Sequence, residues 1–346
     1  MEKSKLISDE IIERVHRDNC FDFLRYLFAF SLILVHFCTL TETEQFWVIS
    51  GQTRVKAFFT ITGFLVVYSF IRRGNIKVYI RKRINRIIPA YMVVVLVCFI
   101  AGIILTKLSP TQFLCDSQSY HYLLANLSFL NFLEPSLPGL FTDNPDIAVN
   151  GSLWSMKYEV LFYILVPFII WLMRRKGKTT IMIVIFAFHI VYHGLFDYLE
   201  DHYTNPLFSA VNHASFNTII YFFSGMAILL YFDYFCHYIK YIFPICVLLT
   251  IILNLADISI LNYIEPLIFS SLIIGTAYYL KPLNFLQRYD NISYGLYLYH
   301  FPVTQIIIQY KIDQYNIFLA FIIMLIATTI LATISWRLIE KPILKR

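Results

Sequence analysis

Residues 21–40 read FDFLRYLFAFSLILVHFCTL, and this stretch decides the fold of the chain. Its length is enough for one helix to cross a membrane. It carries Arg25 and His36 among apolar and aromatic residues, where a polar side chain is costly unless it faces protein or water. On a helix the two side chains lie within roughly 20° of the same face and about 16 Å apart along the axis. The stretch therefore predicts a membrane-spanning helix with one functional face.

The composition extends this prediction to the whole chain. Of the 346 residues, 58% are hydrophobic and only 14% are charged, whereas soluble domains carry about 25% charged residues. The formal charge of +6 does not indicate nucleic-acid binding, because the basic residues stand between apolar stretches and form no face of a soluble module. The six cysteines are scattered without a CxxC pair, so they predict neither a metal site nor a disulfide framework.

The predicted fold class is all-α, a polytopic membrane helix bundle. Apolar windows of about 20 residues define the expected spans. The ten spans are 21–40, 54–71, 87–106, 152–173, 179–196, 215–232, 241–256, 261–280, 292–310 and 316–336. The expected organisation is an N-terminal tail (1–20), a transmembrane domain (21–336) with a long outer loop (107–151), and a C-terminal tail (337–346). The first span is too long for a signal-peptide core and lacks a cleavage site, so it is predicted to be an uncleaved signal anchor.

The basic residues orient these spans. Of the 28 lysines and arginines, 22 lie in the two tails and in alternate loops. Positively charged residues favour the cytoplasmic side of short loops. Both termini are therefore predicted to be cytoplasmic, and the loop 107–151 to be on the outside.

His36 and Glu159 are predicted to lie at similar depth in the outer half of the membrane. A histidine and a carboxylate at matching depth can form an acid/base couple, in which the carboxylate orients the ring. The alternatives are a packing histidine satisfied by a hydroxyl, and for Glu159 an interfacial acid near Lys157. Sequence alone leaves both open.

Three arginines are predicted near the cytoplasmic mouth. Arg25 either clamps an anion there or extends its guanidinium to the lipid headgroups. Arg83 and Arg86 share a helix face and can hold a phosphate together, or they serve as an anchor that sets orientation.

Two further sets of histidines are open to more than one interpretation. His300 lies centrally in the ninth span and is either a second proton carrier or a structural histidine bonded across helices. His189 and His193 are four residues apart, but no third metal ligand is evident.

Six short motifs occur in one order along the chain. They are Phe21-Asp-Phe-Leu-Arg25 with His36, Phe58-Phe-Thr-Ile-Thr62-Gly63-Phe64, Arg83-Ile-Asn-Arg86 with Pro89, Ser152-Leu-Trp154 through Glu159 to Phe162-Tyr163, Ser293 through His300, and Glu340-Lys-Pro342. Together they resemble the acyltransferase-3 family of integral membrane acyltransferases, which includes O-antigen acetylases. Two positions depart from the family pattern: Thr62, where serine is usual, and Lys157, where a small or apolar residue is usual. The hydrolase-like domain that some members append is not expected after residue 346.

The resemblance implies a membrane O-acyltransferase, most simply an O-acetyltransferase of the bacterial inner membrane. It implies acetyl-CoA or another acyl-CoA as donor and a hydroxyl of a cell-surface polysaccharide, or of its lipid-linked precursor, as acceptor. His36 and Glu159 would be catalytic, His36 as general base or as a transient acyl carrier. Arg25, Arg83 and Arg86 would bind the donor, and the acceptor would contact Trp154, Tyr163 and His300. No permanently bound cofactor or metal, no nucleic acid and no particular oligomeric state is expected, and the remaining partners are membrane lipids.

Two other functions remain possible at this point. Intramembrane arginine, histidine and glutamate also line proton or anion paths in transporters and flippases. Many transporters consist of two matching halves, and no repeat of residues 21–173 is found in 179–336. An acyltransferase acting on a small metabolite or a lipid is the third possibility.

Overall fold

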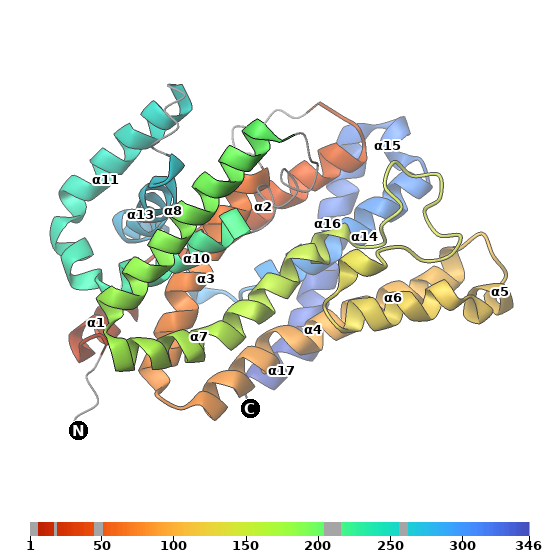
Figure 1. Cartoon of the computed structure of the whole chain (residues 1–346). Helices are drawn as coiled ribbons and strands as arrows, with labels where there is room; N and C mark the ends of the chain where they lie inside the picture. Colours follow the sequence, from red (N-terminus) through yellow and green to blue (C-terminus); the bar gives the residue numbers. More distant parts are fainter. Residues whose placement is uncertain (1–5, 17–18, 45–50, 204–215, 256–261, 346) are drawn as a thin grey trace. The chain divides into compact units, whose positions relative to one another are not determined.

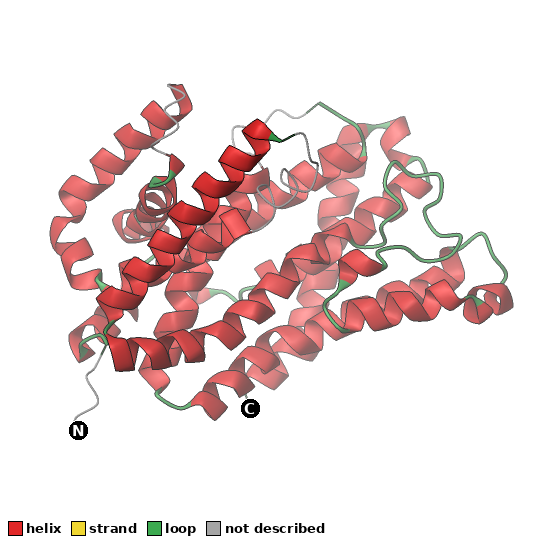
Figure 2. Cartoon of the chain, viewed as in Figure 1, coloured by secondary structure: helices red, strands yellow, loops and turns green. Residues whose placement is uncertain are grey.

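The computed structural model describes residues 6–16, 19–44, 51–203, 216–255 and 262–345. In these residues the regular secondary structure is all helical, with no strand, and loops and turns connect the helices (Figures 1 and 2). The all-helical fold class predicted from sequence is confirmed. Lys3, Lys5, Arg17 and Arg346, which contribute to the predicted cytoplasmic charge, lie outside the described residues.

Each predicted span contains a helix. The long helices are α2 (Phe21–Leu40), α3 (Gly51–Arg73), α4 (Ile76–Leu105), α7 (Met156–Lys176), α8 (Lys178–His202), α10 (Phe216–Leu230), α11 (Phe232–Leu255), α13 (Glu265–Tyr279), α14 (Ser293–Gln309) and α16 (Ile317–Ser335). The shorter elements are α1 (Asp9–His16), α5 (Pro110–Cys115), α6 (Ser117–Leu127), η1 (Asn131–Leu133), η2 (Gly151–Ser155), η3 (Lys281–Arg288), α15 (Ile312–Tyr315), η4 (Trp336–Glu340) and α17 (Lys341–Leu344).

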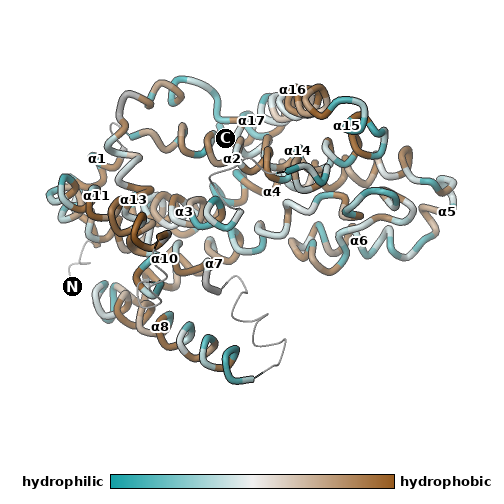
Figure 3. The backbone as a smooth tube through the Cα atoms, turned by 90° about the horizontal axis from the view of Figure 1, so that it is seen from above, coloured by the Kyte–Doolittle hydropathy of each residue, from teal (hydrophilic) through white to brown (hydrophobic). Residues whose placement is uncertain are grey.

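Within the described residues, seven helices are long and apolar enough to cross a membrane. They include α2, whose bounds match the predicted first span. Helices α10, α13 and α14 have 15, 15 and 17 residues and are shorter than a full span. Hydrophobic residues nevertheless predominate along α10 and α13 (Figure 3). Ten spans and cytoplasmic termini therefore remain predictions.

The chain divides into two compact units. Unit 1 comprises Met1–Arg25, Gln52–Tyr79 and Phe162–Tyr289. Unit 2 comprises Tyr26–Gly51, Ile80–Leu161 and Asp290–Arg346. Most of α2 and α4 belongs to unit 2, and most of α7 to unit 1, because the unit boundaries cut these helices near their ends.

Glycines allow two helices of unit 1 to meet backbone to backbone. A Cβ atom placed on Gly63 of α3 would overlap the carbonyl oxygen of Phe222 in α10. One placed on Gly225 of α10 would overlap the carbonyl oxygen of Thr60 in α3. Small residues permit this approach in membrane helices, where close packing provides much of the stability. The glycine of the Thr62-Gly63-Phe64 motif is therefore a packing residue.

A side chain of unit 1 replaces the backbone hydrogen bond that a proline removes from α7. Pro167 has no N–H, so the carbonyl of Tyr163 lacks its helical donor. The hydroxyl of Tyr79 donates to that carbonyl oxygen at 3.3 Å. The backbone of Tyr163 thus takes part in packing between helices.

The N-terminal tail contains α1, which packs within unit 1. The hydroxyl of Tyr68 donates to the carbonyl of Ile12 at 2.8 Å, and that of Tyr278 to the carbonyl of Val15 at 3.1 Å. The apolar residues Ile11 and Val15 are buried. The described part of the tail is therefore part of the folded unit.

The core of unit 2 is formed by α2, α14 and α16. Ile33 and Phe37 of α2 pack with residues of α14 and α16 in one apolar cluster. A Cβ atom placed on Gly295 of α14 would lie 2.8 Å from the Cα atom of Ala332 in α16, so these two helices also touch through their backbones. This packing holds α14 beside the C-terminal half of α2.

The long segment 107–151 is anchored to α14. Gln305, which is fully buried, donates to the carbonyls of Asp146 and Ala148 at 2.7 and 2.6 Å. Asn144 donates to the side chain of Gln305 at 2.9 Å. The segment is therefore ordered against α14 by hydrogen bonds between buried groups.

A second anchor involves a helix proline of unit 2. Pro302 leaves the carbonyl of Leu298 without its helical donor. The side-chain amide of Asn150 donates to this oxygen at 2.9 Å. The end of the long segment thus satisfies a backbone group two residues from His300.

Candidate functional site

The structure brings His36 of α2 and His300 of α14 into direct contact. The Nδ1 atom of His36 lies 2.8 Å from the Nε2 atom of His300. Their rings stack with centroids 5.0 Å apart and an angle of 20° between the planes. His300 is fully buried, whereas His36 is partly exposed. Of the two interpretations of His300, the structure supports bonding across helices, and its partner is the predicted catalytic histidine.

Two further contacts define the positions of these rings. The Nδ1 atom of His300 lies 3.1 Å from the carbonyl oxygen of Leu296. The ring of Phe301 meets that of His36 edge to face, with centroids 5.7 Å apart. A Cβ atom on Gly151 would lie 2.7 Å from the Phe301 ring, so the long segment also packs against this ring. Both imidazoles are held by protein contacts, as the site of a positioned base requires.

Glu159 lies in the first turn of α7, close to Tyr297 of α14. The two side chains interact electrostatically. The hydroxyl of Tyr297 is 3.0 Å from that of Ser155 and also donates to the carbonyl of Ser152. The ring centroid of Tyr297 is 6.2 Å from that of His300. Tyr297 therefore interacts with the predicted carboxylate and lies near His300, and sequence reasoning assigned it no role. Its place one turn before His300 in the Ser293 motif was the available signal.

Trp154 belongs to an aromatic group near the start of α7. Its side chain is 38% exposed, and its ring lies 6.0 Å from that of Tyr158. The ammonium of Lys157 lies 4.1 Å from the ring centroid of Phe132 and 5.1 Å from that of Tyr158. Lys157, which departs from the family pattern, thus makes cation–π contacts here.

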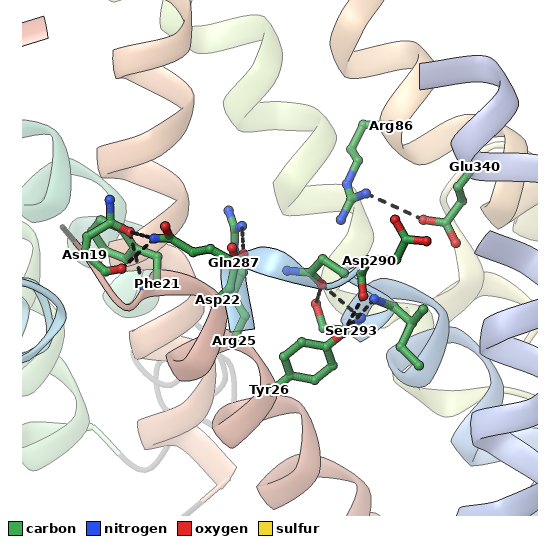
Figure 4. A network of polar contacts seen from close by, with 12 residues as sticks. Asn19, Phe21, Asp22, Arg25, Tyr26, Arg86, Gln287, Asp290, Ser293 and Glu340 are labelled. Carbon is green, nitrogen blue, oxygen red and sulfur yellow. Dashed lines mark hydrogen bonds and ion pairs between the residues drawn. The ribbon is translucent and has the colours of Figure 1, made fainter. Parts of the chain in front are cut away.

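Arg86 is held by a carboxylate and two aromatic rings of unit 2. Its Nη1 nitrogen lies 3.6 Å from Oε2 of Glu340 (Figure 4). The Glu340 side chain is only 1% exposed, whereas that of Arg86 is 28% exposed. Its guanidinium lies 5.9 Å from the ring centroid of Tyr294 and 5.7 Å from that of Trp336. Glu340 ends the π-helical turn η4, and such turns often mark functional sites. Sequence reasoning recognised the Glu340 motif without assigning it a role.

The remaining candidates lie as follows. Arg83 is partly buried on α4, one turn before Arg86. Arg25 forms an ion pair with Asp22 at 3.2 Å within the first turns of α2 (Figure 4). Arg25 and Tyr163 belong to unit 1, while His36, Arg83, Arg86, Trp154, Glu159 and His300 all belong to unit 2.

A loop residue of unit 2 shows a clear electrostatic effect. The Nζ atom of Lys341 donates to Oδ2 of Asp290 at 2.7 Å. This hydrogen bond lowers the pKa of the Asp290 carboxyl. The carbonyl of Asp290 also accepts from Tyr26, whose oxygen in turn accepts from the amide of Ile292 (Figure 4). These bonds hold the beginning of α14 against α2.

Among the described residues, no group of three histidine, cysteine, aspartate or glutamate side chains could hold a metal ion. The ring centroids of His189 and His193 in α8 lie 5.8 Å apart. The Nδ1 atom of His193 lies 2.7 Å from Oδ2 of Asp197. The side chains that the site offers for chemistry are imidazole, carboxylate, hydroxyl and guanidinium groups.

Known proteins with similar sequences identify the family of this chain. The family described as an acyltransferase domain, acyltransferase-3, matches residues 18–337. Nodulation protein 10 of Rhizobium leguminosarum bv. viciae is 29% identical over 360 residues, covering 95% of this chain and 94% of its own. An O-acetyl transferase of Shigella phage Sf6 is 23% identical over 349 residues, covering 96% and 98%. No solved structure matches. The chain therefore belongs to the acyltransferase-3 family, and it is a membrane acyltransferase whose predicted histidine, His36, contacts the buried His300.

Proposed function

We propose that the protein is a membrane O-acetyltransferase that moves an acetyl group from acetyl-CoA to a hydroxyl of a cell-surface polysaccharide or of its lipid-linked precursor. Membership of the acyltransferase-3 family and similarity to an O-acetyl transferase support the reaction class. They also favour an enzyme over the transporter considered from sequence. The expected location is the bacterial inner membrane.

The contact between His36 and His300 carries the proposal. In the proposed reaction His36 is the general base. As the acceptor hydroxyl oxygen attacks the thioester carbonyl, His36 takes the hydroxyl proton. The carbon–sulfur bond then breaks, the acetyl group remains on the acceptor oxygen, and the proton passes from His36 to the departing thiolate of CoA. A partly exposed imidazole hydrogen-bonded to a buried neighbour suits this role, because that contact fixes the direction of the ring.

The donor is proposed to bind at the arginines. Its phosphates would contact Arg83 and Arg86 of unit 2, and Arg25 of unit 1 is a separate candidate for anion binding. Because Arg86 already pairs with Glu340, a phosphate there would share the guanidinium with a buried carboxylate. Arg83 is therefore the arginine to which we assign the larger share of donor binding.

The acceptor is proposed to lie against exposed aromatic surface. Trp154 offers such a surface in unit 2, and Tyr163 of α7 is the second aromatic candidate. Glu159 is assigned to this acceptor region, where it acts on the Tyr297 hydroxyl or on the acceptor itself. A sugar ring stacks well on such side chains because its C–H face is apolar.

The first test replaces the proposed base. Cells producing the His36→Gln variant and membranes prepared from them are given labelled acetyl-CoA, and label in surface glycan is measured. We expect at least a ~10²-fold loss of transfer, because general bases contribute this much or more. His189→Gln is the matched control, since His189 is another histidine on an apolar helix and is buried. Wild-type transfer by a correctly inserted His36→Gln protein would refute the assignment.

The second test separates donor binding from anchoring. Arg83→Ala should raise the KM for acetyl-CoA about 10-fold, the effect of losing roughly one charged hydrogen bond of about 1.5 kcal/mol. Arg81→Ala is the control, because Arg81 is exposed on the same helix. Equal KM values for the two variants would reduce Arg83 to a topological anchor.

A further inference from the structure

The contact between the two histidines specifies where their protons lie. His300 Nδ1 faces the carbonyl oxygen of Leu296 at 3.1 Å. A carbonyl oxygen only accepts hydrogen bonds, so the Nδ1 atom of His300 carries the proton. A neutral imidazole has one N–H, and the Nε2 atom of His300 is then an acceptor.

The tautomer of His36 follows from that of His300. Its Nδ1 atom lies 2.8 Å from the Nε2 atom of His300 and must donate to it. The unprotonated nitrogen of neutral His36 is then Nε2. The opposite arrangement would set two acceptors, His300 Nδ1 and the Leu296 oxygen, against each other in a fully buried place, which is costly.

We propose that His300 is a positioning residue that holds His36 in the Nδ1–H tautomer and so presents Nε2 as the base. The catalytic consequence rests on the proposed function, whereas the tautomer itself does not. In the reaction the acceptor proton goes to Nε2 of His36, and the Nδ1 proton stays in the bond to His300. His300 begins and ends the cycle neutral, which distinguishes it from the carboxylate that usually orients a catalytic imidazole.

The surrounding packing keeps His300 in this position. Gly295 lets α14 meet α16 at the backbone, and Asn150 holds the carbonyl of Leu298. The hydroxyl of Thr304 donates to the carbonyl of His300 at 2.8 Å. Because contacts with α16 and with Asn150 hold α14 at Gly295 and Leu298, the imidazole of His300 has a defined position relative to α2. We therefore assign to His300 the role of orienting His36, which the sequence predicted for Glu159. Glu159 is assigned an interaction with Tyr297 instead.

The direct test is nitrogen-15 NMR of the histidine-labelled full chain in lipid bilayers. The resonances of His36 are identified by their loss in His36→Gln. We expect the Nδ1–H tautomer in the wild type and in His300→Gln, whose amide oxygen can accept the same bond. In His300→Leu, which has no acceptor, we expect the Nε2–H tautomer that free imidazole prefers. An unchanged tautomer in His300→Leu would overturn the proposal, whether or not the protein transfers acetyl groups.

Kinetics in the same membranes test the consequence. His300→Leu should lower kcat about 10²-fold while the KM for acetyl-CoA changes less than about 2-fold. His300→Gln should recover kcat to within about 10-fold of the wild type. His189→Leu controls for loss of a buried histidine, and thermal melting of each variant confirms folding. Equal inactivity of folded His300→Leu and His300→Gln would contradict a positioning role. A tautomer shift in a chain that transfers no acetyl group would refute the proposed function alone.

Discussion

At the scale of single residues, the ion pair with Glu340 distinguishes Arg86 from the other arginines that are predicted to bind the donor. The Glu340 side chain is almost completely buried, whereas the Arg86 side chain is 28% exposed and contacts two aromatic rings. A buried charge that loses its partner is strongly destabilising, whereas a partly exposed one regains water. Arg86 is therefore needed for the stability of unit 2 as well as for any contact with the donor.

This asymmetry predicts unequal effects of two substitutions. Arg86→Met leaves Glu340 buried without its partner and should destabilise the protein by about 3 kcal/mol. Glu340→Gln should cost less, because Arg86 keeps its ring contacts and some exposure to water. Thermal melting of the detergent-solubilised variants measures both, and the double variant should be more stable than Arg86→Met alone. A smaller Tm loss for Arg86→Met than for Glu340→Gln would contradict this account of the pair.

At the scale of elements, the positions of the site residues depend more on close packing between helices than on the helix propensity of each segment. Helices α3 and α10 touch through Gly63 and Gly225 in unit 1, and α14 and α16 touch through Gly295 in unit 2. Lipid is as apolar as a helix surface, so packing and interhelical hydrogen bonds, and not burial from water, hold such helices together. Glycine at these positions determines how near two axes can come.

The contact of α3 and α10 predicts the effect of one added methyl group. In Gly63→Ala the new Cβ atom would overlap a backbone carbonyl that cannot rotate away, so we expect destabilisation on the order of 2–3 kcal/mol. Gly194→Ala in α8 is the control, because the nearest atom to its Cβ would be 3.4 Å away. That substitution should stabilise its helix by about 0.5–1 kcal/mol. Melting curves of both variants compare the two, and equal Tm values would argue against the backbone contact.

At the scale of the whole molecule, the distribution of lysine and arginine predicts the direction of every span. The native cysteines offer a test without added tags. Cys115 in α5 is exposed and belongs to the segment predicted to lie outside, while Cys98 in α4 is buried. The two cysteines therefore differ in access to reagents added outside the cell.

We expect a membrane-impermeant maleimide to label intact cells at Cys115. Cys115→Ser should abolish that labelling, and Cys98→Ser should leave it unchanged because a buried thiol is not reached. Labelling that requires broken cells would place the segment in the cytoplasm and reverse the predicted orientation. Mass spectrometry of the labelled peptide identifies the site.

Much of this architecture could be predicted from the order of residues. Hydrophobic stretches of membrane length define helices, since an unpaired backbone amide is costly in lipid. Each predicted span accordingly contains a helix, and α2 begins and ends where its composition indicates. The six motifs likewise indicate the acyltransferase-3 family, to which the chain belongs.

The partners of the site residues depended on tertiary packing. Sequence paired His36 with Glu159 because the two have similar depth along their helices, but depth does not fix how a helix is rotated or which helix lies beside it. Those are decided by the glycine contacts of α14 and by the hydrogen bonds of residues 144–150 to it. The structure therefore gives His36 a histidine as neighbour and Arg86 a buried glutamate. Local composition determined which segments are helices, and contacts between residues distant in sequence determined which side chains meet.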